Sequence, residues 1–122
     1  MKGKVTARRE AIVRLRVCGR GKTRRIVPGI IDTGYNGSLT LRPSAIRALG
    51  LRRIGLSDGE LADGSVVSFD VYAGVVIWGG RRLAVDIDEA RTDPLVGMEL
   101  LDGYEVNIRV ERGGDVNIRR LP

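Results

Sequence analysis

Residues 30–42 read IIDTGYNGSLTLR, and within them a single carboxylate, Asp32, stands between an apolar run and a glycine-rich turn. The isoleucines before Asp32 and the alternating residues 38–41 after the turn are typical of strands. The pattern therefore predicts a carboxylate that a buried strand delivers into a tight loop. Taken alone, an Asp-Thr-Gly triplet is common, and Asp32 could simply cap the turn by accepting backbone N–H bonds.

Around this stretch, short apolar runs separated by turn residues predict strands along most of the chain. We expect a hairpin from residues 11–17 and 25–31, a long two-armed hairpin from 54–61 and 66–78 with its turn at 62–65, a strand at 83–87, and a closing hairpin from 106–109 and 116–119. Pro43 and Gly50 bracket one short helix, and a second helical turn is expected within 94–103. The predicted fold class is mainly β, with one or two short helices.

The chain has 122 residues, of which 43% are hydrophobic, so it is expected to form a single domain with one packed core. The single cysteine, Cys18, can form no intramolecular disulfide, and without histidine there is no cluster typical of a zinc site. No run approaches the roughly 18 apolar residues of a spanning helix, and the first residues carry no apolar signal segment. We expect a soluble, cytoplasmic protein with no metal, no cofactor and no membrane partner.

The net charge of +6 raises the question of nucleic-acid binding, since a basic surface attracts phosphate. The arginines are spread along the chain in pairs, however, and aromatic residues make up only 4% of it. Solvated arginines between strands are therefore favoured over a nucleic-acid surface. Residues 19–23, GRGKT, imitate the end of a phosphate-binding loop, but a strand is predicted after them instead of a helix, which favours a hairpin turn. From charge alone, an active site would be expected to take acidic substrates.

A second feature lies far downstream of Asp32, where Leu95-Val96-Gly97 places two apolar residues and a glycine before MELL. Together with Ile30-Ile31-Asp32-Thr33-Gly34 and the hairpin between them, it resembles the aspartic proteases, specifically the single-domain retropepsin-like group that includes retroviral proteases and small bacterial relatives. The resemblance covers nearly the whole chain, residues 1–122. It implies the closed, barrel-like β fold of that group, with a flap hairpin over the active site.

The resemblance also implies roles for individual residues. Asp32 corresponds to the catalytic aspartate, Thr33 to the hydroxyl that braces two loops across a dimer, and Gly34 to the glycine that lets the backbone approach the carboxylates. Packing support for the active-site loop is implied for Leu95, Val96 and Gly97. Substrate contacts are implied for Tyr35, Asn36, Ala62, Asp63, Gly64 and Ser65.

The chain departs from the retroviral pattern on both sides of one ion pair. Retroviral members usually have a small residue and then an acidic residue after Asp-Thr-Gly, and an arginine after the later glycine. Here Tyr35 and Asn36 follow Gly34, and Met98 follows Gly97. Both members of the ion pair are therefore absent together, which fits a branch of the group that lacks it, similar to small bacterial members with an aromatic residue before Asn-Gly.

Peptide hydrolysis by carboxylates requires two of them facing one water, one ionised to take its proton and one protonated to hydrogen-bond the carbonyl oxygen. The Asp-Gly pairs at Asp58, Asp63 and Asp102 lack the intervening threonine and read as turns. The second carboxylate should therefore come from a second copy of the chain across a twofold axis. Such a pair shares a proton, as is known of aspartic proteases, so activity should be confined to a pH window and lost in Asp32→Asn.

The favoured function is a homodimeric aspartic endopeptidase that cleaves a peptide or protein substrate. A catalytically silent dimeric module of the same fold that binds peptide, and a basic nucleic-acid-binding β domain, are the alternatives. Two roles are equally open for the tail hairpin, residues 104–121. It could join two subunits through its strand edges, or it could complete the sheet of its own subunit.

Overall fold

The computed structural model describes residues 1–122 and contains ten strands and two short helices. The strands are β1 (Lys2–Val5), β2 (Ala11–Cys18), β3 (Arg24–Ile31), β4 (Leu39–Leu41), β5 (Arg52–Glu60), β6 (Val66–Trp78), β7 (Arg81–Glu89), β8 (Leu95–Val96), β9 (Tyr104–Ile108) and β10 (Asp115–Arg120). The helices are α1 (Pro43–Leu49) and α2 (Met98–Leu101). The predicted mainly β class and each expected hairpin are confirmed, including the turn at residues 19–23, where the amide of Gly19 bonds to the carbonyl of Thr23.

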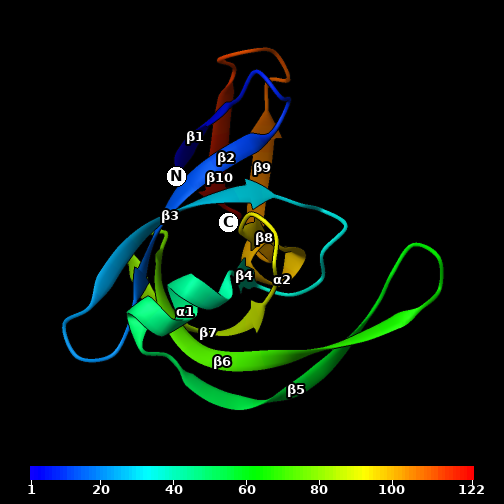
Figure 1. Cartoon of the computed structure of the whole chain (residues 1–122). Coiled ribbons are helices and arrows are strands. Elements are labelled where there is room, and N and C mark those ends of the chain that lie inside the picture. Colours follow the sequence, from blue (N-terminus) through cyan, green and yellow to red (C-terminus); the bar gives the residue numbers. More distant parts are fainter.

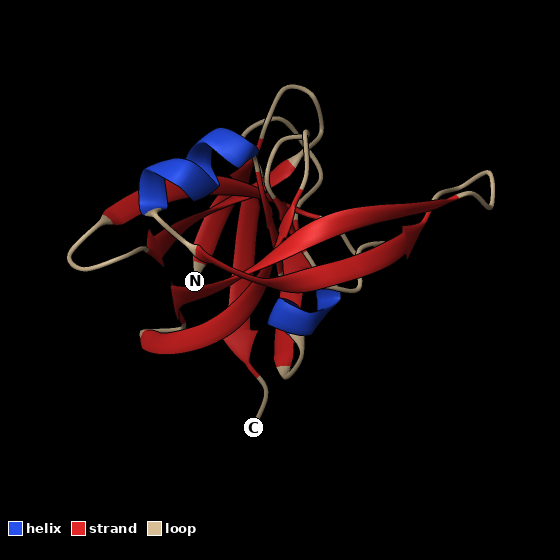
Figure 2. Cartoon of the chain, turned by 60° about the horizontal axis from the view of Figure 1, so that its bottom comes forward, coloured by secondary structure: helices blue, strands red, loops and turns tan.

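All ten strands belong to one sheet of order β5-β6-β7-β4-β8-β3-β2-β1-β10-β9. An additional pairing between β6 and β2, with Val17 opposite Val76, closes the strands from β6 to β2 into a ring. Beyond the ring, β1, β10 and β9 continue the sheet at the top of Figure 1. At the other end of the sheet the β5–β6 hairpin stands clear of the body, as Figure 2 also shows.

Alternating apolar and charged residues decide which face of each strand is buried. In β2, Val13, Leu15 and Val17 are at most 2% exposed, while the arginines between them face solvent. Each such side chain contributes about 1.5–3 kcal/mol when fully buried. The core continues into the tail, where Val116 and Ile118 of β10 are buried to the same extent.

The predicted helix at residues 43–50 is confirmed as α1. Pro43 occupies its first turn, where a missing N–H costs nothing, and Gly50 ends it in the left-handed conformation at φ 64°. The amide of Gly50 bonds to the carbonyl of Arg47, and Ile46 and Leu49 face the core. The helix therefore joins β4 to β5 and lies in the chain between the Asp32 loop and the β5–β6 hairpin.

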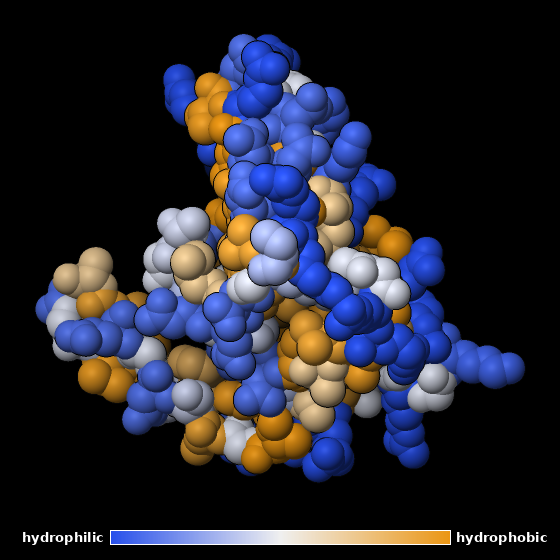
Figure 3. All heavy atoms as spheres, turned by 180° about the vertical axis from the view of Figure 1, so that it is seen from behind, coloured by the Kyte–Doolittle hydropathy of each residue, from blue (hydrophilic) through white to orange (hydrophobic).

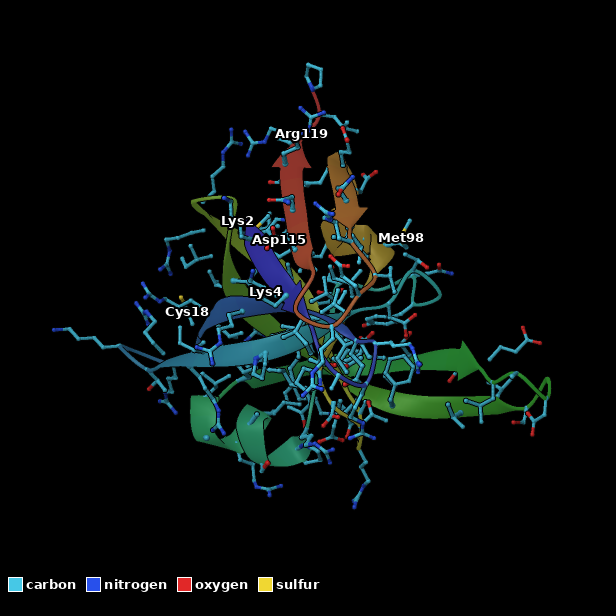
Figure 4. All side chains as sticks on the ribbon, turned by 90° about the horizontal axis from the view of Figure 1, so that it is seen from above. Lys2, Lys4, Cys18, Met98, Asp115 and Arg119 are labelled. Carbon is cyan, nitrogen blue, oxygen red and sulfur yellow. The ribbon has the colours of Figure 1, made fainter.

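The tail hairpin completes the sheet of its own subunit, which was one of the two alternatives for it. β10 pairs with β1 through Val116 opposite Gly3, and β1 pairs in turn with β2. Figure 4 shows Lys4 on β1 beside Asp115 on β10, and their ion pair measures 2.6 Å. The sequence analysis assigned no strand to residues 2–5, because their short lysine-rich pattern has no apolar run. β9 is left as one edge of the sheet.

Figure 3 shows hydrophilic and apolar side chains mixed over the body, and both kinds also on the projecting β5–β6 hairpin. The exposed large apolar residues of this hairpin are Ile54, Leu56, Leu61, Val66 and Val67. Nothing in the chain's own fold covers them. Neither helix has the length and apolar character needed to cross a membrane.

Candidate active site

Asp32 lies immediately after the end of β3, at the point where this strand pairs in parallel with β8. Ile30 and Ile31 pair with Leu95 and Val96. The amide of Ile30 bonds to the carbonyl of Pro94 at 2.8 Å, and the amide of Asp32 bonds to that of Val96 at 2.9 Å. A strand with apolar residues therefore brings the carboxylate to the border of the core and fixes its backbone there.

The loop after β3 closes around the Asp32 carboxylate. The amide of Gly34 donates to Asp32 Oδ1 at 2.9 Å, and the amide of Tyr35 donates to the Asp32 carbonyl at 3.2 Å. A Cβ on Gly34 would lie 3.3 Å from Oδ1, which is a tight contact, so glycine suits this position. Asp32 thus does cap its turn, but only through Oδ1, and no protein donor bonds Oδ2. Thr33 is exposed and its hydroxyl makes no hydrogen bond within the chain.

Gly97 and the start of α2 hold the rest of this loop. The amides of Gly97, Met98 and Glu99 donate to the carbonyls of Ser38, Tyr35 and Gly37, at 3.0, 2.8 and 3.2 Å. A Cβ on Gly97 would lie 2.1 Å from the Gly37 carbonyl oxygen, so no other residue fits without moving the backbone. The structure therefore brings the distant segment 95–97 against the Asp32 loop.

Tyr35 connects the loop to a third part of the chain. Its hydroxyl donates to Asp88 Oδ2 on β7 at 2.5 Å. Burial, followed by the hydrogen bond to Asp88, raises the pKa of the Tyr35 hydroxyl well above its ordinary value. Burial also raises the pKa of the Asp88 carboxyl, against the opposing effect of the bond from Tyr35. The sequence analysis gave Asp88 no role.

A groove of about 710 Å³ lies between this loop and the β5–β6 hairpin, seen from behind as a hollow in Figure 3. Residues 34–38 of the loop line one side, and residues 54–60 of β5 with Phe69 and Val71 line the other. Asp32 is not in the lining, but the residues that follow it are. The carboxylates that line the groove are Asp58, Glu60, Asp86, Asp88 and Glu99, and no lysine or arginine lines it. The groove is thus acidic in a chain that is basic overall.

Only some of the residues predicted to bind substrate lie in the groove. Tyr35 and Asn36 line the groove. Ala62, Asp63, Gly64 and Ser65 form the exposed tip of the projecting hairpin and do not line it. At the tip, Asp63 Oδ1 accepts bonds from the amide and hydroxyl of Ser65, and these bonds lower the pKa of the Asp63 carboxyl. The tip is therefore an ordered turn that stands away from Asp32 within one subunit.

Met98 stands where the retroviral pattern has an arginine. It is the first residue of α2, and its side chain is 45% exposed and carries no charge (Figure 4). Its backbone, in contrast, bonds to Tyr35 as described above. The loop and α2 are therefore joined here through the main chain.

Comparisons of the chain with protein-family models, curated proteins and solved structures found no match.

Proposed function

We propose that the chain is an aspartic endopeptidase with a retropepsin-like fold that works as a homodimer. Each subunit would contribute one Asp32, and the two carboxylates would share a proton and activate one water for attack on a peptide bond. A single chain supplies only one such carboxylate, because the other Asp-Gly pairs lie in turns or strands without the same loop. The active site would therefore form on the twofold axis of the dimer.

One observation carries this proposal. Asp32 has one oxygen held by the Gly34 amide and the other without a protein donor, on a loop that main-chain bonds tie to β8 and α2. A carboxylate that only capped a turn would not need this rigid support. Thr33 and Gly34, exposed at the same loop, leave its surface open to a second copy.

The groove and the hairpin support the choice of an extended substrate. The groove runs from the Asp32 loop along β5, and two of the exposed apolar residues of the β5–β6 hairpin, Ile54 and Leu56, line it. A peptide bound in the groove would cover part of this apolar surface, and the hairpin would act as the flap. Residues 54–60 of β5 line the groove one after another, and such a strand can lie beside several residues of an extended peptide.

The direct test is cleavage of a peptide library by the wild type and by Asp32→Asn, with oligomeric state measured by sedimentation. The amide side chain that replaces the Asp32 carboxylate still offers an acceptor to the Gly34 amide, so the variant should fold and dimerise but lose cleavage. Binding of peptides without cleavage by the wild type would instead indicate the catalytically silent module.

A mixing experiment tests whether the two carboxylates come from two chains. Wild type is equilibrated with an equal amount of Asp32→Asn, so that subunits exchange at random. Activity per wild-type chain should fall to about half, because half of these chains then have an inactive partner. Unchanged activity would show that each subunit works alone, contrary to the proposal.

A further inference from the structure

We propose that Tyr35 is a positioning residue, whose hydrogen bond to Asp88 fixes the Asp32 loop to β7. The inference rests on the proposed function, because its purpose is to hold the catalytic carboxylate in place. It gives a role to the residue at which the chain departs from the retroviral pattern.

The backbone of Tyr35 makes hydrogen bonds to two other residues of the site. Its amide bonds to the carbonyl of Asp32, and its carbonyl accepts the amide of Met98. With the hydroxyl bound to Asp88, one residue joins the catalytic loop to both α2 and β7. A displacement of the Tyr35 side chain would therefore be passed directly to the Asp32 backbone.

Two glycines define the place of the Tyr35 ring. A Cβ on Gly37 would lie 2.4 Å from the Tyr35 hydroxyl oxygen, and a Cβ on Gly97 would lie 2.5 Å from its Cδ2. The ring thus fills the space that these residues leave open by having no side chain. Because the ring is confined in this way, its hydroxyl is held in one direction, toward Asp88.

Asp88 provides a rigid acceptor. It sits within β7, opposite Val71 of β6 on one side and Thr40 of β4 on the other, so its backbone is paired along both edges. No cation forms an ion pair with it, and the nearby carboxylates of Asp86 and Glu99 add negative charge. The Tyr35 hydroxyl is its one hydrogen-bond donor from another side chain. Loss of the hydroxyl would leave a half-buried carboxylate without a partner.

The kinetic test compares Tyr35→Phe with Asp88→Ala and Asp88→Asn. Tyr35→Phe keeps the ring but removes the donor, and we expect kcat to fall about tenfold with KM changed little, because a small misplacement of the reacting groups slows the chemical step. Asp88→Ala should behave alike, while Asp88→Asn keeps an acceptor and should restore most of kcat. The double variant Tyr35→Phe/Asp88→Ala should be no slower than either single variant.

Tyr72→Phe is the matched control. Tyr72 lies on β6 opposite Ile87 of β7, and its hydroxyl makes no hydrogen bond. Its removal should leave kcat unchanged. A wild-type kcat in Tyr35→Phe, or an Asp88→Asn variant as slow as Asp88→Ala, would overturn the positioning role.

Amide hydrogen exchange separates this inference from the proposed function, because it needs no activity. In Tyr35→Phe, the amides of Gly34 and Tyr35 should exchange faster, while the amide of Ile118, bonded to Met1 in the distant tail, should not change. If the wild type cleaves no peptide, the proposed function fails, and the exchange rates still decide whether Tyr35 fixes the loop. Unchanged exchange at Gly34 and Tyr35 in a folded Tyr35→Phe variant would contradict the inference.

Discussion

The backbone nitrogen of Met98 donates a hydrogen bond to the carbonyl oxygen of Tyr35 at 2.8 Å. Met98 stands where the retroviral pattern has the arginine of its ion pair, and Tyr35 stands where that pattern has a small residue, directly before Asn36 at the acidic position. The two residues are joined by this main-chain bond, and the Tyr35 ring also packs against Gly97. The Asp32 loop, α2 and β7 therefore meet at one junction around Tyr35. Substitutions at this junction should change the free energy of unfolding.

Gly97→Ala should be strongly destabilising. The new Cβ would lie 2.1 Å from the Gly37 carbonyl oxygen and 2.5 Å from Tyr35 Cδ2, so the loop or α2 must shift. We expect the free energy of unfolding in urea to fall by about 3 kcal/mol, the upper end of overpacking effects. Gly55→Ala is the control, since nothing lies within 4 Å of its added Cβ, and its stability should change little. Equal stability of the two variants would contradict the close packing at Gly97.

Asp88→Asn should remove a part of the pH dependence of stability. Burial raises the pKa of Asp88 in the folded state, so between its unfolded and folded pKa the native protein holds a proton that the unfolded chain has lost. Stability from this group therefore falls as pH rises through that window. We expect Asp88→Asn to be more stable than wild type at pH 7, with the difference vanishing below about pH 4.

The measurement is urea denaturation of both proteins at a series of pH values. The carboxylates of Asp86 and Glu99, which lie near the same junction, are present in both proteins. A difference in stability that is the same at every pH would show that the Asp88 charge is not responsible.

Local patterns in the sequence account for most of the framework. The alternating apolar pattern predicted the hairpins, and Pro43 with Gly50 predicted α1. The resemblance pointed to the Asp32 loop and Leu95-Val96-Gly97, two segments that lie together in the structure. These features succeed because turn residues, helix caps and apolar runs act over a few neighbouring residues. The pairing of the two distant segments followed from resemblance, which no local pattern supplies.

The remaining features depend on contacts between residues far apart in the chain. Tyr35 and Asp88 are 53 positions apart, and on β7 Asp86 and Asp88 look like ordinary solvent-facing residues of an alternating strand. The net charge of +6 likewise says nothing about where the carboxylates gather, so it suggested acidic substrates, whereas the groove is lined with acids. The flap tip was predicted from its turn residues, but its distance from the groove is set by the length of β5 and β6.

The charge of the groove predicts a preference for basic peptides. Five carboxylates, Asp58, Glu60, Asp86, Asp88 and Glu99, line it without a cation, so a lysine or arginine side chain would be attracted and a glutamate repelled. Matched peptides that differ only in one such residue should show a higher kcat/KM with the basic residue. The advantage should shrink between low and high salt, because exposed charges are screened. Faster cleavage of the acidic peptide at low salt would contradict the prediction.

Removal of residues 104–122 should unfold the chain. The tail supplies Val116 and Ile118, at most 1% exposed, and the loss of each costs about 1.5–3 kcal/mol of burial, while β1 loses its partner β10. Tyr104, which packs edge-on against Trp78 at 5.8 Å between ring centres, is lost as well. Circular dichroism should show no cooperative thermal transition, while removal of the exposed Pro122 alone should leave the transition unchanged. A truncated chain that stays folded as a monomer would mean that the tail serves the contact between subunits instead of the core of its own.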